Sequence, residues 1–281
     1  MARFCDGVSD HASCHYEDRQ EYAPHFGSFV QRGGACVERR RSPRRVDRPV
    51  YKGRLVIAVS ESDVTRRRVV VCDYGIGNLR SVVYGLSAAG INAELITTPE
   101  QAIGASAVIL PGVGAFGSCA DALRNSGFDQ VVIQAQVLGV ATLAICVGLQ
   151  LLFEGSDESP AVEGLAILPG VVRELPSMVK KPQMQWNIVN DDGCIDRRDH
   201  QALRDSVGKN AWMYFVHSYA ARPTNDTALV ADYGVAFTAA IAKGNLWATQ
   251  FHPEKSSLAG RRLLHGFGSL IDNAPATLVL Q

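Results

Sequence analysis

A cysteine at the end of an apolar run is the first residue in this sequence placed like a nucleophile. Residues 141–145 form the run, Cys146 ends it, and Gly148 follows two residues later. This order is typical of a nucleophile elbow, in which a sharp strand-to-helix turn exposes the reactive side chain. The start of the next helix then favours a thiolate through its dipole and unpaired N–H groups. A cysteine in an apolar segment is also often only a small buried side chain, so the pattern alone leaves both interpretations open.

A histidine and a carboxylate follow a second apolar run. His252 comes directly after residues 246–251, and Glu254 stands two residues later, with Pro253 restricting the backbone between them. A thiol nucleophile needs a base that takes its proton and later protonates the leaving amine, and the base needs an acceptor that orients it. The sequence therefore indicates that Cys146, His252 and Glu254 act together in acyl transfer.

A glycine-rich turn after a third apolar run completes the candidate site. It reads Pro111-Gly112-Val113-Gly114, and glycines let backbone N–H groups come close to a substrate oxygen. We expect the N–H groups of Gly112, Val113 and Gly114, with that of Val147, to form an oxyanion hole. Such turns also often only reverse the chain, so the loop is informative only beside the other two segments.

The elements around these segments predict an α/β fold. The strands expected in the first half are 69–72, 93–96, 107–110 and 141–145, and the helices between them are 78–89, 119–124 and 129–138. Asn78 is expected to cap the first of these helices, Pro111 to end the third strand, and a helix to run from Cys146 through Phe153. Continuous apolar strands that alternate with helices are typical of a parallel sheet covered on both faces.

The second half of the chain has shorter strands separated by turns, which predicts a mixed sheet with a small antiparallel part. The expected strands are 164–168, 171–175, 185–189, 213–216, 228–231, 236–242 and 246–251. A helix over residues 257–271 is expected to close the domain.

Together, these segments resemble the class I glutamine amidotransferases, which use a Cys-His-Glu triad. Further motifs are most similar to those of the glutaminase subunits of imidazole glycerol phosphate synthase. They are residues 73–81 (DYGIGNLRS), 111–116 (PGVGAF), 183–187 (QMQWN), 214–219 (YFVHSY) and 250–256 (QFHPEKS). The resemblance covers roughly residues 68–270. It implies an amidotransferase domain over residues 68–281 with a flavodoxin-like, mainly parallel sheet flanked by helices.

The resemblance also implies a role for each matching residue. Cys146 attacks the carboxamide of L-glutamine, His252 is the base and then the acid, and Glu254 holds the imidazole. The residues implied to bind glutamine are Gln150, Glu158, Ser218 and Tyr219. Those implied to lie at a partner interface are Asn78, Trp186, Tyr214 and Lys255. No cofactor and no metal is implied.

The implied partner is a cyclase subunit with a (β/α)8 barrel, joined to this chain in a heterodimer. It uses the ammonia to make imidazole glycerol phosphate and aminoimidazole carboxamide ribotide in histidine biosynthesis. Three alternatives are a triad glutaminase of another synthase (anthranilate or pyridoxal phosphate), a catalytically silent regulatory subunit, and a cysteine peptidase. The motifs DYGIGNLRS and YFVHSY argue against the first and the intact triad against the second, while the His-Pro-Glu placement fits glutaminases better than peptidases.

Four positions depart from the family pattern. Val147 replaces a usual leucine, which is tolerable because its expected contribution is the backbone N–H. Ala144 stands where glycine is usual, which is sterically mild beside the elbow. Gln183 and Gln185 replace a histidine and a glycine in a segment that faces the cyclase in the family. We therefore expect these two residues to affect docking or allosteric coupling to the partner.

The composition predicts a globular protein without a membrane or nucleic-acid partner. Hydrophobic residues make up 47% and charged residues 20% of the chain, the balance of an ordinary soluble domain. No apolar run reaches the roughly 18–20 residues that span a bilayer, and the N-terminus has no secretory signal pattern. The seven cysteines are odd in number and none are spaced C-x-x-C, which argues against a disulfide framework. We expect a cytoplasmic protein.

Residues 1–67 differ from the rest and lie outside the resemblance. They show little apolar periodicity, and residues 38–45 form a basic run broken by Pro43. We expect a disordered extension, or an upstream region translated from a start codon assigned too early. Two alternatives are contact of the basic run with acidic surfaces and a metal site, although the cysteine and histidine spacings fit no usual zinc pattern.

Overall fold

The computed structural model describes residues 67–191, 194–274 and 276–280. The predictions made for residues 1–66 lie outside the described residues, and the boundary near residue 67 stays a prediction.

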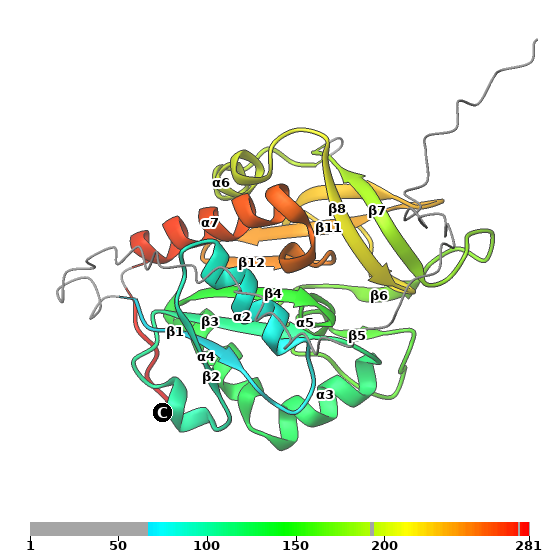
Figure 1. The fold of residues 1–281 in the computed structure, drawn as a ribbon. Helices are drawn as coiled ribbons and strands as arrows, with labels where there is room; N and C mark the ends of the chain where they lie inside the picture. Colours follow the sequence, from blue (N-terminus) through cyan, green and yellow to red (C-terminus); the bar gives the residue numbers. More distant parts are fainter. Residues whose placement is uncertain (1–66, 192–193, 275, 281) are drawn as a thin grey trace, which may run out of the picture. The chain divides into compact units, whose positions relative to one another are not determined.

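A seven-stranded mixed sheet is the centre of the fold (Figure 1). Its order is β10 (Thr227–Asp232), β11 (Ala236–Lys243), β12 (Leu246–Thr249), β4 (Ala141–Cys146), β3 (Ala107–Gly112), β1 (Val69–Cys72) and β2 (Ala93–Ile96). The strands from β12 to β2 pair in parallel, whereas β11 pairs antiparallel with both of its neighbours. Every residue of β1, β3, β4 and β12 is buried, because helices cover both faces of this part of the sheet. The predicted α/β class is confirmed.

Helices flank the sheet, with α2 packed beside α7 and α3 beside α4 (Figure 1). They are α2 (Leu79–Ala88), α3 (Phe116–Asn125), α4 (Phe128–Leu138), α5 (Val147–Leu151), α6 (Arg198–Val207) and α7 (Ser257–Asn273), with short 3-10 turns η1 (Pro99–Ala102) and η2 (Pro253–Lys255). None of the helices in the described ranges is long and apolar enough to cross a membrane.

Two small sheets complete the second half of the described chain. One contains β5 (Gly155–Ser156), β6 (Val171–Glu174) and β9 (Tyr219–Ala221), and the other is the antiparallel pair of β7 (Gln183–Val189) and β8 (Ala211–His217). The predicted small antiparallel part is therefore present, although it is divided between these two sheets.

Several local predictions are wrong. Residues 164–168 form no strand, because N–H groups of this segment donate to carbonyls at the end of α5 and just after it. The Leu165 N–H, for example, donates to Leu151 O at 2.7 Å. The side chain of Asn78 makes no capping hydrogen bond to α2. The third strand does not end at Pro111 but runs to Gly112. A proline, which has no N–H, is tolerated in a strand where no hydrogen bond of the sheet requires that group. The helix after Cys146 ends at Leu151 rather than Phe153.

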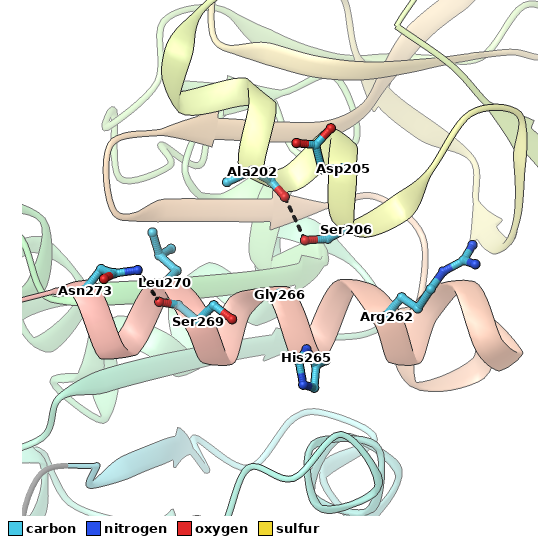
Figure 2. Close-up of a pocket in the computed structure, with 9 residues that line it drawn as sticks. All are labelled: Ala202, Asp205, Ser206, Arg262, His265, Gly266, Ser269, Leu270 and Asn273. Carbon is cyan, nitrogen blue, oxygen red and sulfur yellow. Dashed lines mark hydrogen bonds between the residues drawn. The ribbon is translucent and has the colours of Figure 1, made fainter.

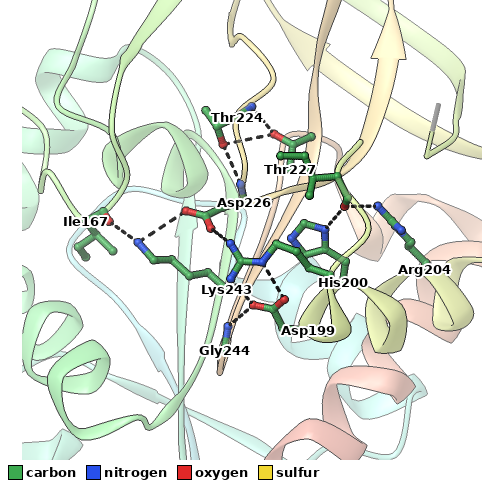
Figure 3. Close-up of polar contacts among 11 residues, drawn as sticks. Ile167, Asp199, His200, Arg204, Thr224, Asp226, Thr227, Lys243 and Gly244 are labelled. Atoms are coloured by element: carbon green, nitrogen blue, oxygen red, sulfur yellow. Dashed lines mark hydrogen bonds and ion pairs between the residues drawn. The ribbon is translucent and has the colours of Figure 1, made fainter. Parts of the chain in front are cut away.

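The helix α6 was not predicted, and a network of charged groups holds its start (Figure 3). Asp226 accepts a hydrogen bond from Arg197 at 2.8 Å and lies 3.6 Å from the Lys243 ammonium. Asp199 accepts bonds from Arg197 and from the Gly244 N–H. These contacts tie α6 to β10 and to the turn after β11, and they contain no predicted site residue.

The carboxyl ends of three neighbouring strands position the site. Gly112 of β3 is in register with Cys146 of β4, and Ile145 of β4 with Thr249 of β12. The segments that leave these strands therefore begin side by side at one edge of the sheet, which is where parallel α/β sheets place their ligands. These are the glycine-rich turn, the cysteine elbow and the segment leading to His252.

Candidate active site

Cys146 lies at a strained elbow between β4 and α5. Its φ of 56° and ψ of −111° place it in a region that residues with a side chain rarely adopt. Such strain persists only where the surroundings impose it, and it is typical of functional sites. Gly148 permits the turn, since a Cβ there would be 2.2 Å from the carbonyl oxygen of Leu110. The predicted nucleophile elbow is present in the structure.

His252 and Glu254 are paired behind this elbow. The imidazole Nδ1 lies 2.9 Å from Oε1 of Glu254, and the two side chains are only 5% and 1% exposed. With Nδ1–H donating to the carboxylate, the other ring nitrogen is free to act on a thiol. Burial lowers the pKa of His252, but hydrogen bonds to Cys146 and Glu254 and the charges of both outweigh it, so the pKa is raised. The imidazole is thus held as a strong base beside the sulfur.

Backbone contacts fasten the histidine segment onto β8. The His252 N–H donates to Tyr214 O at 3.0 Å, and the Ser256 hydroxyl donates to His252 O at 2.6 Å. The Tyr214 N–H donates in turn to the same hydroxyl at 3.0 Å. His252 is therefore held by the neighbouring strand as well as by its own turn.

A cavity of about 230 Å³ opens beside Cys146. The predicted site residues that line it are Cys146, His252, Val147, Val113, Gly114, Gln150, Glu158, Ser218 and Tyr219. Pro182, Val216 and His217 also line it and were not among the predicted site residues. The structure thus brings the predicted nucleophile, base, oxyanion and substrate-binding residues together around one hollow.

Gly112 is the predicted oxyanion residue that does not line the cavity. A Cβ at Gly112 would be 2.5 Å from the backbone nitrogen of Gly148, so the glycine allows β3 to approach the elbow. Two side chains brace the loop beyond it. Glu158 accepts a hydrogen bond from the Phe116 N–H at 2.7 Å, and the Cys119 thiol donates to Val113 O at 3.3 Å.

The amide of Gln150 is engaged within the protein. It donates to Tyr219 O at 2.9 Å and to the Gln250 side chain at 3.0 Å. Gln250 was not among the predicted site residues, although it stands in the QFHPEKS motif two residues before His252. Its amide carries no charge and titrates at no pH, so the residue pattern gave no signal of a role.

Of the four predicted interface residues, Trp186 and Tyr214 lie on the outer face of the β7–β8 pair. They face each other in register, with ring centroids 6.0 Å apart, and Trp186 is 43% exposed. Asn78 is half-buried just before α2, and Lys255 is exposed in η2. None of the four lines the cavity at Cys146.

Gln183 lies on the opposite, inner face of the same pair. Its side chain is completely buried, and it is in register with His217. The Gln183 side chain is therefore not on the exposed surface, and its effect on docking or coupling to the partner stays a prediction. Gln185 is exposed, so its effect on docking also stays a prediction.

A second hollow lies between α6 and α7, away from the predicted site (Figure 2). Its volume is about 460 Å³, and its polar lining includes Asp205, Arg262 and His265. No predicted site residue lines it, and Gly266 is there for close packing, because a Cβ would be 1.9 Å from the Ser206 hydroxyl. Within the described ranges, no group of three or more His, Cys, Asp or Glu residues is placed to hold a metal ion.

Comparisons with known proteins agree with this geometry. Residues 70–267 match the family described as glutamine amidotransferase class-I. An imidazole glycerol phosphate synthase subunit HisH from Symbiobacterium thermophilum is 41% identical over 216 residues, which cover 75% of this chain and 99% of that protein. The subunit of the same name from Deinococcus radiodurans is 42% identical over 204 residues, covering 71% of this chain and 92% of that protein.

The comparison with solved structures supports the fold alone. The structure of PurLQS from Thermotoga maritima has a TM-score of 0.58 at 17% identity, over 73% of this chain and 98% of that one. From the family match and the relatives at more than 40% identity, the chain belongs to the class-I glutamine amidotransferases and, within them, to the HisH subunits of imidazole glycerol phosphate synthase.

Proposed function

We propose that Cys146, His252 and Glu254 hydrolyse glutamine to glutamate and ammonia, and that a cyclase subunit of imidazole glycerol phosphate synthase uses this ammonia. The observation that carries the proposal is the His252–Glu254 pair at 2.9 Å, with His252 and the strained Cys146 lining one cavity. A nucleophile, a base and an orienting acceptor in this order are the parts that thioester chemistry needs.

The first half of the reaction forms a thioester. His252 takes the proton of the Cys146 thiol, the sulfur attacks the side-chain carboxamide carbon of glutamine, and the carbonyl oxygen takes up the negative charge. Val113, Gly114 and Val147 line the cavity, and we assign the stabilisation of that oxygen to their backbone N–H groups. His252 then gives its proton to the leaving nitrogen, so that the carbon–nitrogen bond breaks and ammonia departs.

The second half consumes water. His252, now neutral, takes a proton from a water molecule that attacks the thioester carbon. The carbon–sulfur bond breaks, glutamate leaves, and Cys146 and His252 return to their starting states. Glu254 keeps the imidazole in the orientation that both halves require, because it accepts the Nδ1–H bond throughout.

Glutamine binding is assigned to Gln150, Glu158, Ser218 and Tyr219, all of which line the cavity. The Glu158 carboxylate suits the substrate ammonium group, since it is the acid among them. The hydroxyl and backbone groups of Ser218 and Tyr219 suit the remaining polar atoms of an amino acid. Their positions in the lining of one hollow support binding of a small zwitterion there.

The exposed face of the β7–β8 pair is proposed as part of the surface that contacts a (β/α)8-barrel cyclase. Its outer residues are apolar or aromatic: Met184 and Trp186 from β7, with Trp212 and Tyr214 from β8. Aromatic side chains are enriched in the cores of protein interfaces. Asn78 and Lys255 extend this surface, since α2 and η2 lie next to each other and η2 lies next to β8.

The experiment compares glutamate release by the wild type and by Cys146→Ala, with and without the cyclase and its nucleotide ligand. We expect low release from the chain alone, a rise with the liganded partner, and none above background from Cys146→Ala. Cys72→Ala, a buried thiol in β1, is the matched control and should retain activity. Undiminished release by Cys146→Ala would overturn the proposal.

A further inference from the structure

Gln250 is a buried polar residue that contacts Cys146 and that the mechanism above does not use. Its side chain is completely buried, and Nε2 lies 3.8 Å from the Cys146 sulfur as a hydrogen-bond donor. It stands between β12 and His252, and its own N–H is held by Ala239 O at 2.9 Å. The backbone that carries this amide is therefore fixed on the central sheet.

A second contact decides which end of the Gln250 amide faces the sulfur. The oxygen Oε1 accepts a hydrogen bond from the Gln150 amide at 3.0 Å, and Gln150 also donates to Tyr219 O at 2.9 Å. An amide group offers one acceptor atom and one donor atom. Because Gln150 occupies the acceptor, the donor must point toward Cys146.

The sulfur lies between this donor and an acceptor. The Cys146 Sγ also lies 3.8 Å from the carbonyl oxygen of Val216. A thiol can donate its proton to that carbonyl, whereas a thiolate has only acceptor capacity and gains from the Gln250 N–H. Hydrogen bonds to a charged group are stronger than those between neutral groups. The amide thus favours the ionised sulfur.

Other titratable groups surround the same sulfur or its cavity, and Gln250 differs from each of them. His252 directly precedes η2, which carries Glu254. Tyr74 follows β1, Cys119 is on α3, and Glu158 lines the cavity. All of these groups exchange protons. The Gln250 amide does not, so its contribution persists at every pH.

We propose that Gln250 is a positioning residue that donates its side-chain N–H to Cys146, holding the sulfur in place and stabilising its thiolate. The proposal rests on the proposed function only in naming Cys146 the nucleophile. Its own test measures the thiolate and needs no glutamine turnover, so the two can fail separately.

The test is the pH dependence of Cys146 alkylation by iodoacetamide, followed by mass spectrometry of the peptide that contains Cys146. Gln250→Met keeps the size of the side chain but removes the donor. In this variant we expect the alkylation rate at neutral pH to fall about tenfold, and the midpoint of the rate's pH dependence to move to higher pH. With glutamine and the liganded cyclase, kcat should fall. Thr249→Val, a buried neighbour whose hydroxyl bonds Phe251 O instead, should leave the alkylation midpoint unchanged.

Gln250→Glu provides a second variant of the same shape. Its carboxylate still accepts from Gln150 but repels a thiolate, so the midpoint should move further upward than in Gln250→Met. Circular dichroism and thermal melting check that each variant folds. If a folded Gln250→Met or Gln250→Glu protein shows the wild-type alkylation midpoint, the proposal is overturned.

Discussion

Gly85 of α2 lies directly against Glu254, so that a Cβ on Gly85 would be 2.8 Å from the Glu254 Cβ and 3.1 Å from its Cα. The absence of a side chain lets α2 approach the turn that carries the triad carboxylate. The same helix begins beside Asn78, on the surface proposed to meet a cyclase. A rigid element therefore connects the proposed partner surface with Glu254, and a shift of α2 would be felt at the triad.

Gly85→Ala should slow glutamine hydrolysis. Alanine is the better helix former by about 1 kcal/mol, but the added methyl group must displace Glu254, and overpacking typically costs about 1–3 kcal/mol. We expect a lower melting temperature and a kcat reduced about tenfold or more, with KM less affected. Ser87→Ala, at an exposed position on the same helix, should change neither. Full activity of Gly85→Ala would contradict the prediction, because it would show that Glu254 keeps its function when a methyl group is added at Gly85.

Glu254→Gln should reduce kcat by about 10²–10⁴-fold, because a neutral amide accepts from Nδ1–H more weakly than a carboxylate and no longer offsets the charge of the imidazolium. The carboxylate also contributes to the raised pKa of His252. We therefore expect the pKa of His252, followed by NMR, to lie below the wild-type value of about 10. Cys146→Ala should lower it as well, since the sulfur is the other group that raises it. An unchanged titration in both variants would contradict the electrostatic picture of the triad.

The site was predictable where its chemistry is local in sequence. Two pairs of residues follow an apolar run within a few positions: Cys146 with Gly148, and His252 with Glu254. Their residue types and spacing were enough to identify them. The contact between Gly85 and Glu254 joins residues far apart in the chain, and it depends on the packing of α2 on η2. No periodicity reveals such a contact. The same holds for Gln250, whose neutral amide gains a role only from its distance to Cys146.

The missed elements have equally physical reasons. The helix α6 buries only His200, Leu203 and Val207, an apolar stripe too narrow to stand out from its charged surroundings. Residues 164–168 have a strand-like composition, but their N–H groups pair with carbonyls at the end of α5 instead of with a strand.

His217 should make folding sensitive to acid. Burial is the main cause that lowers its pKa to about 4, the nearby His252 charge lowers it further, and a hydrogen bond to Tyr219 O opposes both. Between pH 6.5 and about 4 the unfolded chain therefore binds a proton that the folded chain does not, so stability falls as the pH falls through this range. The loss is at most about 3 kcal/mol.

Urea unfolding at pH 7 and pH 5 tests this expectation. In His217→Gln, the loss of stability between the two pH values should be smaller than in the wild type. His265→Gln, at an exposed position on α7, is the control and should keep the wild-type dependence. If wild type and His217→Gln lose the same stability between pH 7 and pH 5, His217 does not set the acid sensitivity.

Gln183→Met should stabilise the protein. The Gln183 side chain is completely buried, and neither its nitrogen nor its oxygen has a hydrogen-bond partner within the described ranges. An unpaired buried polar group costs about 1–3 kcal/mol, and methionine fills a similar volume without that cost. We expect a gain of about 1 kcal/mol or more, seen as a rise in melting temperature of roughly 2–4 °C per kcal/mol. Gln185→Met, at an exposed position on the same strand, should stay within about 0.5 kcal/mol of wild type.

If Gln183→Met is instead less stable than wild type, the Gln183 amide must have a partner in solution. His217, which is in register with it and whose Nε2 is also unpaired within the described ranges, is then the group whose NMR signal should shift in the variant.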